Sequence, residues 1–88
     1  MDVIHREYAK GENRIFYVAD NESINSVIGH LYLPIGLEKK ILEFKKYDNL
    51  TWYLNIIFEF QGTHLIRIFE DGVEIMRLFA NVLPWMKW

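Results

Sequence analysis

Residues 51–69, TWYLNIIFEFQGTHLIRIF, carry the clearest structural signal in the chain. Large apolar side chains occupy every second position from Trp52 to Phe60, and mostly polar residues lie between them. Because successive side chains of a strand point to opposite faces, this spacing predicts one apolar face and one water-facing face. Gln61-Gly62 can then form a tight turn, since glycine readily adopts positive φ. The stretch therefore predicts a β-hairpin.

A hairpin of this size needs further strands packed against it. Burying five large apolar side chains contributes about 8–15 kcal/mol, whereas ordering ten residues costs about 10–20 kcal/mol. The chain has 88 residues, 51% of them hydrophobic and 16% aromatic, which is enough for one thin core. We therefore expect a single domain over residues 1–88.

Turn-forming residues recur near positions 11, 21, 35, 48, 61 and 71, so that breaks fall every 10 to 14 residues. Regular turns at this spacing indicate short strands that follow one another. We predict a mainly β fold, an antiparallel meander of about six strands that forms a small sandwich or barrel, with room for one short helix. A β-rich α+β fold is the alternative.

Three segments fit either a helix or a strand. Residues 23–29 have helical spacing, but Gly29 lies inside the run. Residues 37–47 combine good helix formers with an alternation that suits a lysine-rich edge strand. Residues 73–83 follow an Asp-Gly turn, which favours a strand, although the acidic start would also cap a helix. We favour strand for the second and third segments and leave the first open.

The composition excludes several classes of function. The chain has no cysteine, which excludes disulfides, zinc–thiolate sites and thiol catalysis, and its formal net charge is −2. Its start does not resemble a signal peptide, and no run approaches the roughly 18 apolar residues of a membrane span. We expect a cytoplasmic protein that uses no membrane, metal or cofactor.

The histidines form no recognisable catalytic or metal-binding motif. His5, His30 and His64 have no second ligand at a familiar metal spacing. In the predicted hairpin Glu59 would face His64, and this pair could act as a pH-sensitive site. We interpret it instead as a solvated surface pair of little energetic consequence.

The carboxylates are scattered, and the densest cluster is Glu70, Asp71 and Glu74. This cluster could hold a hard cation, but no Asx-rich loop of calcium-site spacing surrounds it. We interpret it as a solvated hairpin tip. Because no acid, base and nucleophile stand in a catalytic pattern, we expect no enzymatic activity.

Basic and aromatic residues alternate in the middle of the chain. Such interleaving on a β-surface is typical of OB-like proteins that bind single-stranded nucleic acid, because lysines contact phosphate and rings stack on bases. The negative net charge argues against this function, and a solvated lysine edge is the simpler reading. The candidate nucleic-acid-binding residues are Lys39, Lys40, Phe44, Lys45, Lys46 and Tyr47.

The C-terminal residues Trp85, Met86 and Trp88 are difficult to explain by folding alone, because chain ends usually fray. They either fold back over the end of the sheet or contact a partner, since Trp, Met and Tyr are enriched in interfaces. Together with Tyr53, they are the candidate interaction residues.

The profile favours a non-enzymatic protein–protein interaction module over a catalyst. Such a module acts by presenting a shaped surface that blocks or bridges a protein partner, and a homodimer is a companion hypothesis. A small phage or bacterial inhibitor, including one directed at host defence, has this general profile. The alternative function is single-stranded nucleic-acid binding through the Lys39–Tyr53 region.

Overall fold

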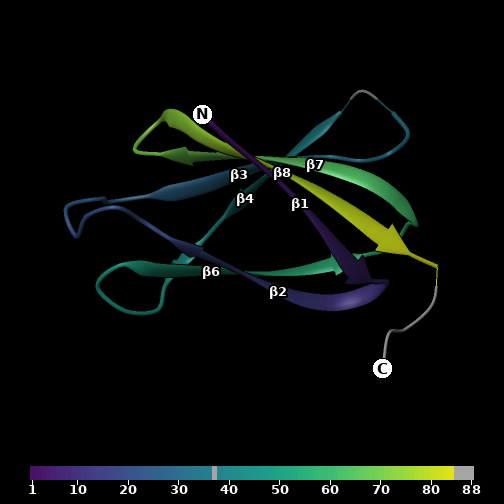
Figure 1. Cartoon of the computed structure of the whole chain (residues 1–88), viewed down its shortest axis with the longest axis horizontal. Coiled ribbons are helices and arrows are strands. Elements are labelled where there is room, and N and C mark those ends of the chain that lie inside the picture. The colour runs from purple at the N-terminus through teal and green to yellow at the C-terminus, as the bar shows by residue number, and fades with distance from the viewer. Residues whose placement is uncertain (37, 85–88) are drawn as a thin grey trace.

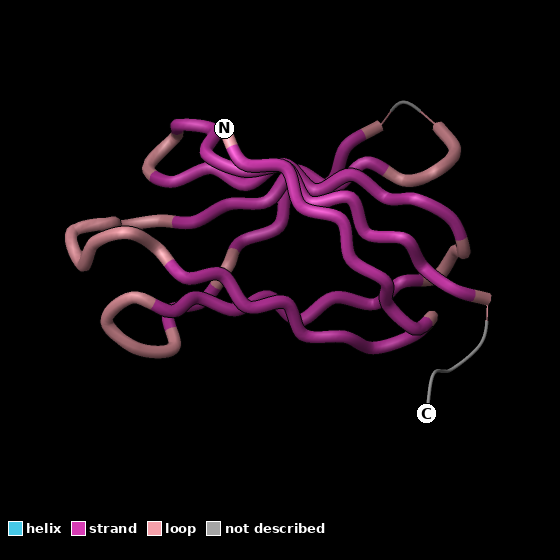
Figure 2. Tube along the Cα trace, viewed as in Figure 1, coloured by secondary structure: helices cyan, strands magenta, loops and turns pink. Residues whose placement is uncertain are grey.

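Strands make up most of the computed structural model, which describes residues 1–36 and 38–84. Figure 2 shows no helix in these residues. The eight strands are β1 (Asp2–Ala9), β2 (Gly11–Val18), β3 (Val27–Tyr32), β4 (Lys39–Glu43), β5 (Lys45–Lys46), β6 (Thr51–Phe58), β7 (Gly62–Glu70) and β8 (Val73–Leu83).

The strands form two sheets that face each other across the core (Figure 1). The large sheet has the strand order β1-β8-β7-β3-β4, and the small sheet has the order β2-β6-β5. The predicted small β-sandwich is therefore confirmed. The strand order is more complex than a meander, because β1 pairs with β8 in parallel and the chain repeatedly changes sheet.

The predicted hairpin over residues 51–69 is wrong, although both of its strands exist. β6 pairs with β2 and β5 in the small sheet, whereas β7 pairs with β3 and β8 in the large sheet. Gly62 does adopt positive φ, at 111°, but it turns the chain from one sheet to the other. An alternating pattern specifies which face is buried, and it does not specify the neighbouring strand.

The three ambiguous segments contain no helix in the part of the chain that the structure describes. Residues 24–26 are loop and β3 begins at Val27, β4 and β5 occupy most of 39–46, and β8 spans 73–83. Gly29 pairs with Leu42 and Ile68 in β3, and glycine fits this position because a Cβ would lie only 3.2 Å from the Phe44 ring and 3.3 Å from Ile66. The Asp71-Gly72 turn joins β7 and β8 as predicted, with φ of 46° and 86°.

The inward-facing side chains of both sheets form the core. Those of β6 are the alternate residues expected from the sequence, since Trp52, Leu54, Ile56 and Phe58 are all buried. The other buried apolar residues come from β2, β3, β7, β8 and two positions between strands: Ile15, Tyr17, Ala19, Val27, Leu31, Phe44, Ile66, Ile68, Leu78, Ala80 and Val82. The core therefore lies between the two sheets.

The acidic cluster at the β7–β8 turn is only partly solvated, since Asp71 is exposed and Glu70 and Glu74 are half-buried. Tyr17 of β2 donates a hydrogen bond to Glu70, which links the two sheets. Burial and this hydrogen bond raise the pKa of Tyr17. Asp71 accepts hydrogen bonds from the backbone N–H groups of Asn25 at 3.0 Å and Ser26 at 2.9 Å. The turn folds back onto the loop before β3, so its carboxylates meet protein donors.

We expect Phe58→Ala to lower the free energy of unfolding by about 3–5 kcal/mol, because it opens a cavity at a ring that is 1% exposed. The neighbouring Ile57→Ala is the control, since Ile57 is 62% exposed and its loss should cost about 0.5 kcal/mol or less. Urea denaturation measures both values. Equal losses at the two positions would contradict the inward orientation of Phe58.

Candidate functional site

An exposed cluster of rings lies on the outer side of the small sheet. Phe16 of β2 lies directly opposite Tyr53 of β6, and Lys45 of β5 lies opposite Tyr53 on the other side. Directly opposed residues share a face, so these side chains form one row across the sheet. Tyr47 follows β5, and Arg14 is two residues before Phe16. We call Arg14, Phe16, Lys45, Tyr47 and Tyr53 the aromatic face.

The rings of the aromatic face contact one another. Tyr47 packs edge-on against Phe16, with ring centroids 6.0 Å apart, and against Tyr53, with centroids 6.3 Å apart. The Arg14 guanidinium lies 4.7 Å from the centre of the Tyr53 ring, and its Nε donates to Asn55 Oδ1 at 2.8 Å. Edge-to-face and cation–π contacts fix the orientation of these side chains before any partner arrives.

The amount of apolar surface on this face is high for an outward-facing sheet. Phe16 is 55% exposed and Tyr47 is 64% exposed. Val18 at one end and Ile57 at the other are each 62% exposed. Exposed rings that contact one another are typical of a binding site on a small domain, whereas single exposed apolar residues are ordinary.

The outer side of the large sheet is different because its charges are paired internally. Glu74 accepts hydrogen bonds from Arg67 at 2.6 Å and from Arg77 at 2.8 Å. These two guanidiniums lower the pKa of Glu74 to about 2. Arg67 also lies over the Phe69 ring, 5.4 Å from its centre. This network satisfies its own charges, so the aromatic face is the better candidate for binding.

The structure brings together some of the residues that the sequence suggested. Tyr53 lies at the centre of the aromatic face, next to Lys45 and Tyr47 from the candidate nucleic-acid set. Lys46 lies on the other side of the small sheet, opposite the buried Trp52, with its Nζ 5.5 Å from the centre of the Trp52 ring. The predicted interaction residues Trp85, Met86 and Trp88 lie outside the described residues.

Other members of the candidate nucleic-acid set are separated from this group. Phe44 is 3% exposed in the core between β4 and β5, so its ring is not available for stacking on a base. Lys39 and Lys40 are in β4, at the edge of the large sheet, whereas Lys45 and Lys46 are in the small sheet. The chain crosses between sheets at Phe44, and this crossing divides the lysines.

Sequence reasoning missed Arg14 and Phe16. The signal was present in residues 14–19, RIFYVA, where apolar residues occupy both sets of alternate positions. In a sandwich only one side of a strand faces the core, so such a strand must leave apolar side chains on the outside. Here Ile15 and Tyr17 are buried and Phe16 is exposed.

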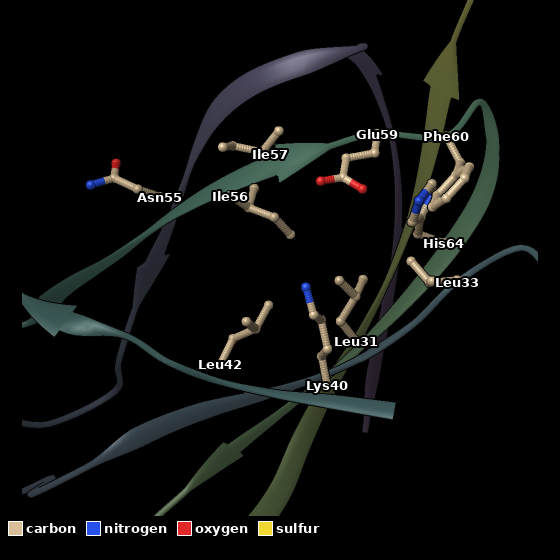
Figure 3. A pocket seen from close by; sticks show the side chains of 10 residues that line it. All are labelled: Leu31, Leu33, Lys40, Leu42, Asn55, Ile56, Ile57, Glu59, Phe60 and His64. Carbon is tan, nitrogen blue, oxygen red and sulfur yellow. The ribbon is translucent and has the colours of Figure 1, made fainter. Parts of the chain in front are cut away.

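A second site is a pocket of about 290 Å³ between the edges of β4 and β6 (Figure 3). Most of its lining is apolar, and the polar groups come from four residues. The apolar lining is Leu31, Leu33, Leu42, Ile56, Ile57 and Phe60, and the polar lining is Lys40, Asn55, Glu59 and His64.

The histidine in this pocket is not the solvated residue that we expected. His64 is 1% exposed, lies opposite Ala80 of β8, and packs edge-on against Phe58 with centroids 5.0 Å apart. The expected pairing with Glu59 is wrong because the hairpin that would create it does not form. His64 Nδ1 lies 3.1 Å from the Gly62 carbonyl oxygen, and Nε2 is buried without a hydrogen-bond partner in the part of the chain that the structure describes.

Burial lowers the pKa of His64 below its ordinary value of 6.5, and this effect exceeds the raising contributions of the Gly62 and Ala80 backbone. Desolvation disfavours the charged imidazolium, so the ring is neutral at neutral pH. A neutral, buried imidazole can hold or accept one proton in a defined direction, but it has no catalytic partner in hydrogen-bond contact.

No group of three or more His, Asp or Glu residues in 1–36 and 38–84 is arranged to hold a metal ion. Over the same residues, no helix is long and apolar enough to cross a membrane.

Comparisons with known proteins support the fold alone. No family model matches the chain, and no curated protein matches it. The structure is similar to that of "a putative glycoside hydrolase" from Bacteroides vulgatus, with a TM-score of 0.59 and 13% sequence identity. The similarity covers 99% of this chain and 17% of that one, so this fold occurs there within a much longer protein.

We expect the folded protein to lose stability as the pH falls below about 6.5, because the unfolded chain then binds a proton that buried His64 resists. His64→Phe should remove this part of the pH dependence. The measurement is the free energy of unfolding in urea between pH 8 and pH 5. The exposed His5→Gln is the control and should retain the wild-type profile; an unchanged profile for His64→Phe would contradict the assignment.

Proposed function

We propose that the chain is a non-catalytic interaction module whose aromatic face binds a protein partner. The observation that carries the proposal is the group of three rings on the outer side of the small sheet, in which Tyr47 contacts both Phe16 and Tyr53. The core between the sheets is formed by other side chains, so folding alone does not require this cluster.

The residue types of the aromatic face suit protein binding. Aromatic residues and arginine are the commonest energetic centres of protein interfaces, because they bury large areas and carry polar groups at their ends. The ring contacts and the Arg14–Asn55 hydrogen bond already restrict these side chains. Little conformational entropy is therefore lost on binding, which favours affinity.

The charges beside the rings indicate the chemistry of the partner. Arg14 and Lys45 lie on opposite sides of Tyr53. A matching surface carries acidic side chains around an apolar patch, and charge complementarity would speed association at low salt. Covering such a surface is how a small inhibitor acts, so the proposal includes phage or bacterial inhibitors directed at a host protein.

A single-stranded nucleic acid is the second candidate partner. Tyr47, Tyr53 and Lys45 together form a small stacking surface next to a phosphate-binding cation. The burial of Phe44 and the separation of Lys39 and Lys40 reduce the extent of that surface. The net charge of −2 also gives no general attraction to a polyanion. We therefore place a protein partner first.

The test identifies a partner and then measures its affinity. The full chain captures proteins from a lysate of its native host, and each captured protein is purified and titrated against the chain. We expect Phe16→Ala/Tyr47→Ala to raise the Kd by about tenfold or more, and Arg14→Glu to slow association. Both targeted rings are exposed, so the double variant should fold.

Ile41→Ala is the matched control, because Ile41 is 65% exposed at the edge of the large sheet. It should bind as the wild type does. A partner that binds the double variant and the wild type equally would contradict the proposal. Binding of labelled single-stranded oligonucleotide, weakened by salt and by Tyr53→Ala, would favour the second candidate. A solution mass of two chains, lost in the double variant, would assign the face to a homodimer.

A further inference from the structure

We propose that the pocket between β4 and β6 binds a small, neutral aromatic molecule that carries one N–H or O–H donor, with the donor directed at His64 Nε2. This site opens between the sheets, whereas the aromatic face lies on the outer side of the small sheet. Asn55 and Ile57 border both sites, and the proposal does not rest on the proposed function. It follows from the opening between the sheets, the apolar walls, and the unpartnered nitrogen.

The pocket exists because β5 is too short to cover β6. β5 consists of Lys45 and Lys46, and it pairs only with Trp52 and Tyr53. Within the described residues, no strand pairs with the rest of β6 on that edge. The space between the two sheets is therefore open to solvent beside residues 54–58. Leu42 of β4 and Ile56 of β6 face the opening from opposite sheets (Figure 3).

The hydrogen bonding of His64 determines the tautomer. A backbone carbonyl oxygen can only accept, so Nδ1, which lies 3.1 Å from the Gly62 oxygen, carries the ring proton. Nε2 of the neutral ring then has a lone pair and accepts a hydrogen bond. This nitrogen is buried and has no hydrogen-bond partner among residues 1–36 and 38–84. A buried acceptor without a donor costs free energy. A ligand that donates a hydrogen bond to it therefore binds more tightly than one that does not.

The volume and lining of the pocket define the ligand. A cavity of about 290 Å³ is roughly twice the size of an apolar cavity of about 150 Å³ that accommodates benzene. A fused bicyclic ring is therefore the appropriate size. The pocket has one cation, Lys40, and one anion, Glu59, so it has no net preference for a charged ligand. Indole, with one N–H on an apolar bicycle, has the required chemistry.

Access to the nitrogen requires one side chain to move. Nε2 is closed to water in the unliganded protein. Phe60 lines the same end of the pocket as His64, and its ring is 43% exposed (Figure 3). A partly exposed ring has room to change rotamer, so Phe60 is the side chain that would turn aside.

The probe is free indole, compared with benzofuran, which has the same shape but no donor. Calorimetry with the full chain should show that indole binds about tenfold or more tightly than benzofuran, because only indole satisfies Nε2. The ¹⁵N resonance of His64 Nε2 should move on addition of indole, while that of Nδ1 should stay that of a protonated nitrogen. His64→Phe should remove the preference for indole.

A pair of neighbouring variants tests the location. Leu42→Trp places a bulky ring in the pocket and should abolish indole binding. Ile41→Trp is the matched control, because Ile41 is on the same strand, is 65% exposed and does not line the pocket. It should bind as the wild type does. Phe16→Ala/Tyr47→Ala should also bind indole normally, which separates this site from the aromatic face.

Three results would overturn the proposal. The first is no indole binding at millimolar concentration, and the second is equal affinity for indole and benzofuran. The third is binding that survives Leu42→Trp. Each of these leaves the proposed function of the aromatic face untouched.

Discussion

The sheet change between Phe58 and His64 is the constraint on which the rest of the structure depends. Both side chains are fully buried, yet they belong to facing sheets. The backbone turns at Gly62, where φ is 111° and a Cβ would lie 3.2 Å from the ring of Pro34. Glycine permits both the positive φ and the close approach. This change of direction packs Phe58 against His64 and places the histidine between the sheets. It also brings β7 to the centre of the large sheet.

Local sequence patterns predicted the strands and their buried faces, but they did not predict which strands pair. The alternation from Trp52 to Phe58 correctly gave the inward side chains, and Asp71-Gly72 correctly gave the β7–β8 turn. Gln61-Gly62 looked like a similar turn, yet it joins different sheets. The corner at Gly62 and the turn at Gly72 both use positive φ at glycine, so the local residues do not distinguish them.

The candidate sites were less predictable because each arises from pairing. Tyr53 was recognised from its residue type, but its neighbour Phe16 is brought to it only by the β2–β6 register. His64 was assigned to the surface because its strand was paired with the wrong neighbour. The pocket beside it exists because β5 is two residues long and leaves most of that edge of β6 unpaired. No local sequence pattern predicts how far along β6 the pairing extends. Strand propensity describes single residues, whereas both sites depend on strand length and register.

The parallel pairing of β1 with β8 has a consequence for how the molecule is made. Asp2–Ala9 pairs with Met76–Leu83, so β1, the edge strand of the large sheet, can pair only after a strand some seventy residues later has been synthesised. Until then its backbone donors and acceptors have only water or a foreign strand to bind. Such distant pairing slows the search for the native state. The chain is therefore open to mispairing at this edge until β8 is available, and the pairing of β1 with β8 is a late event in folding.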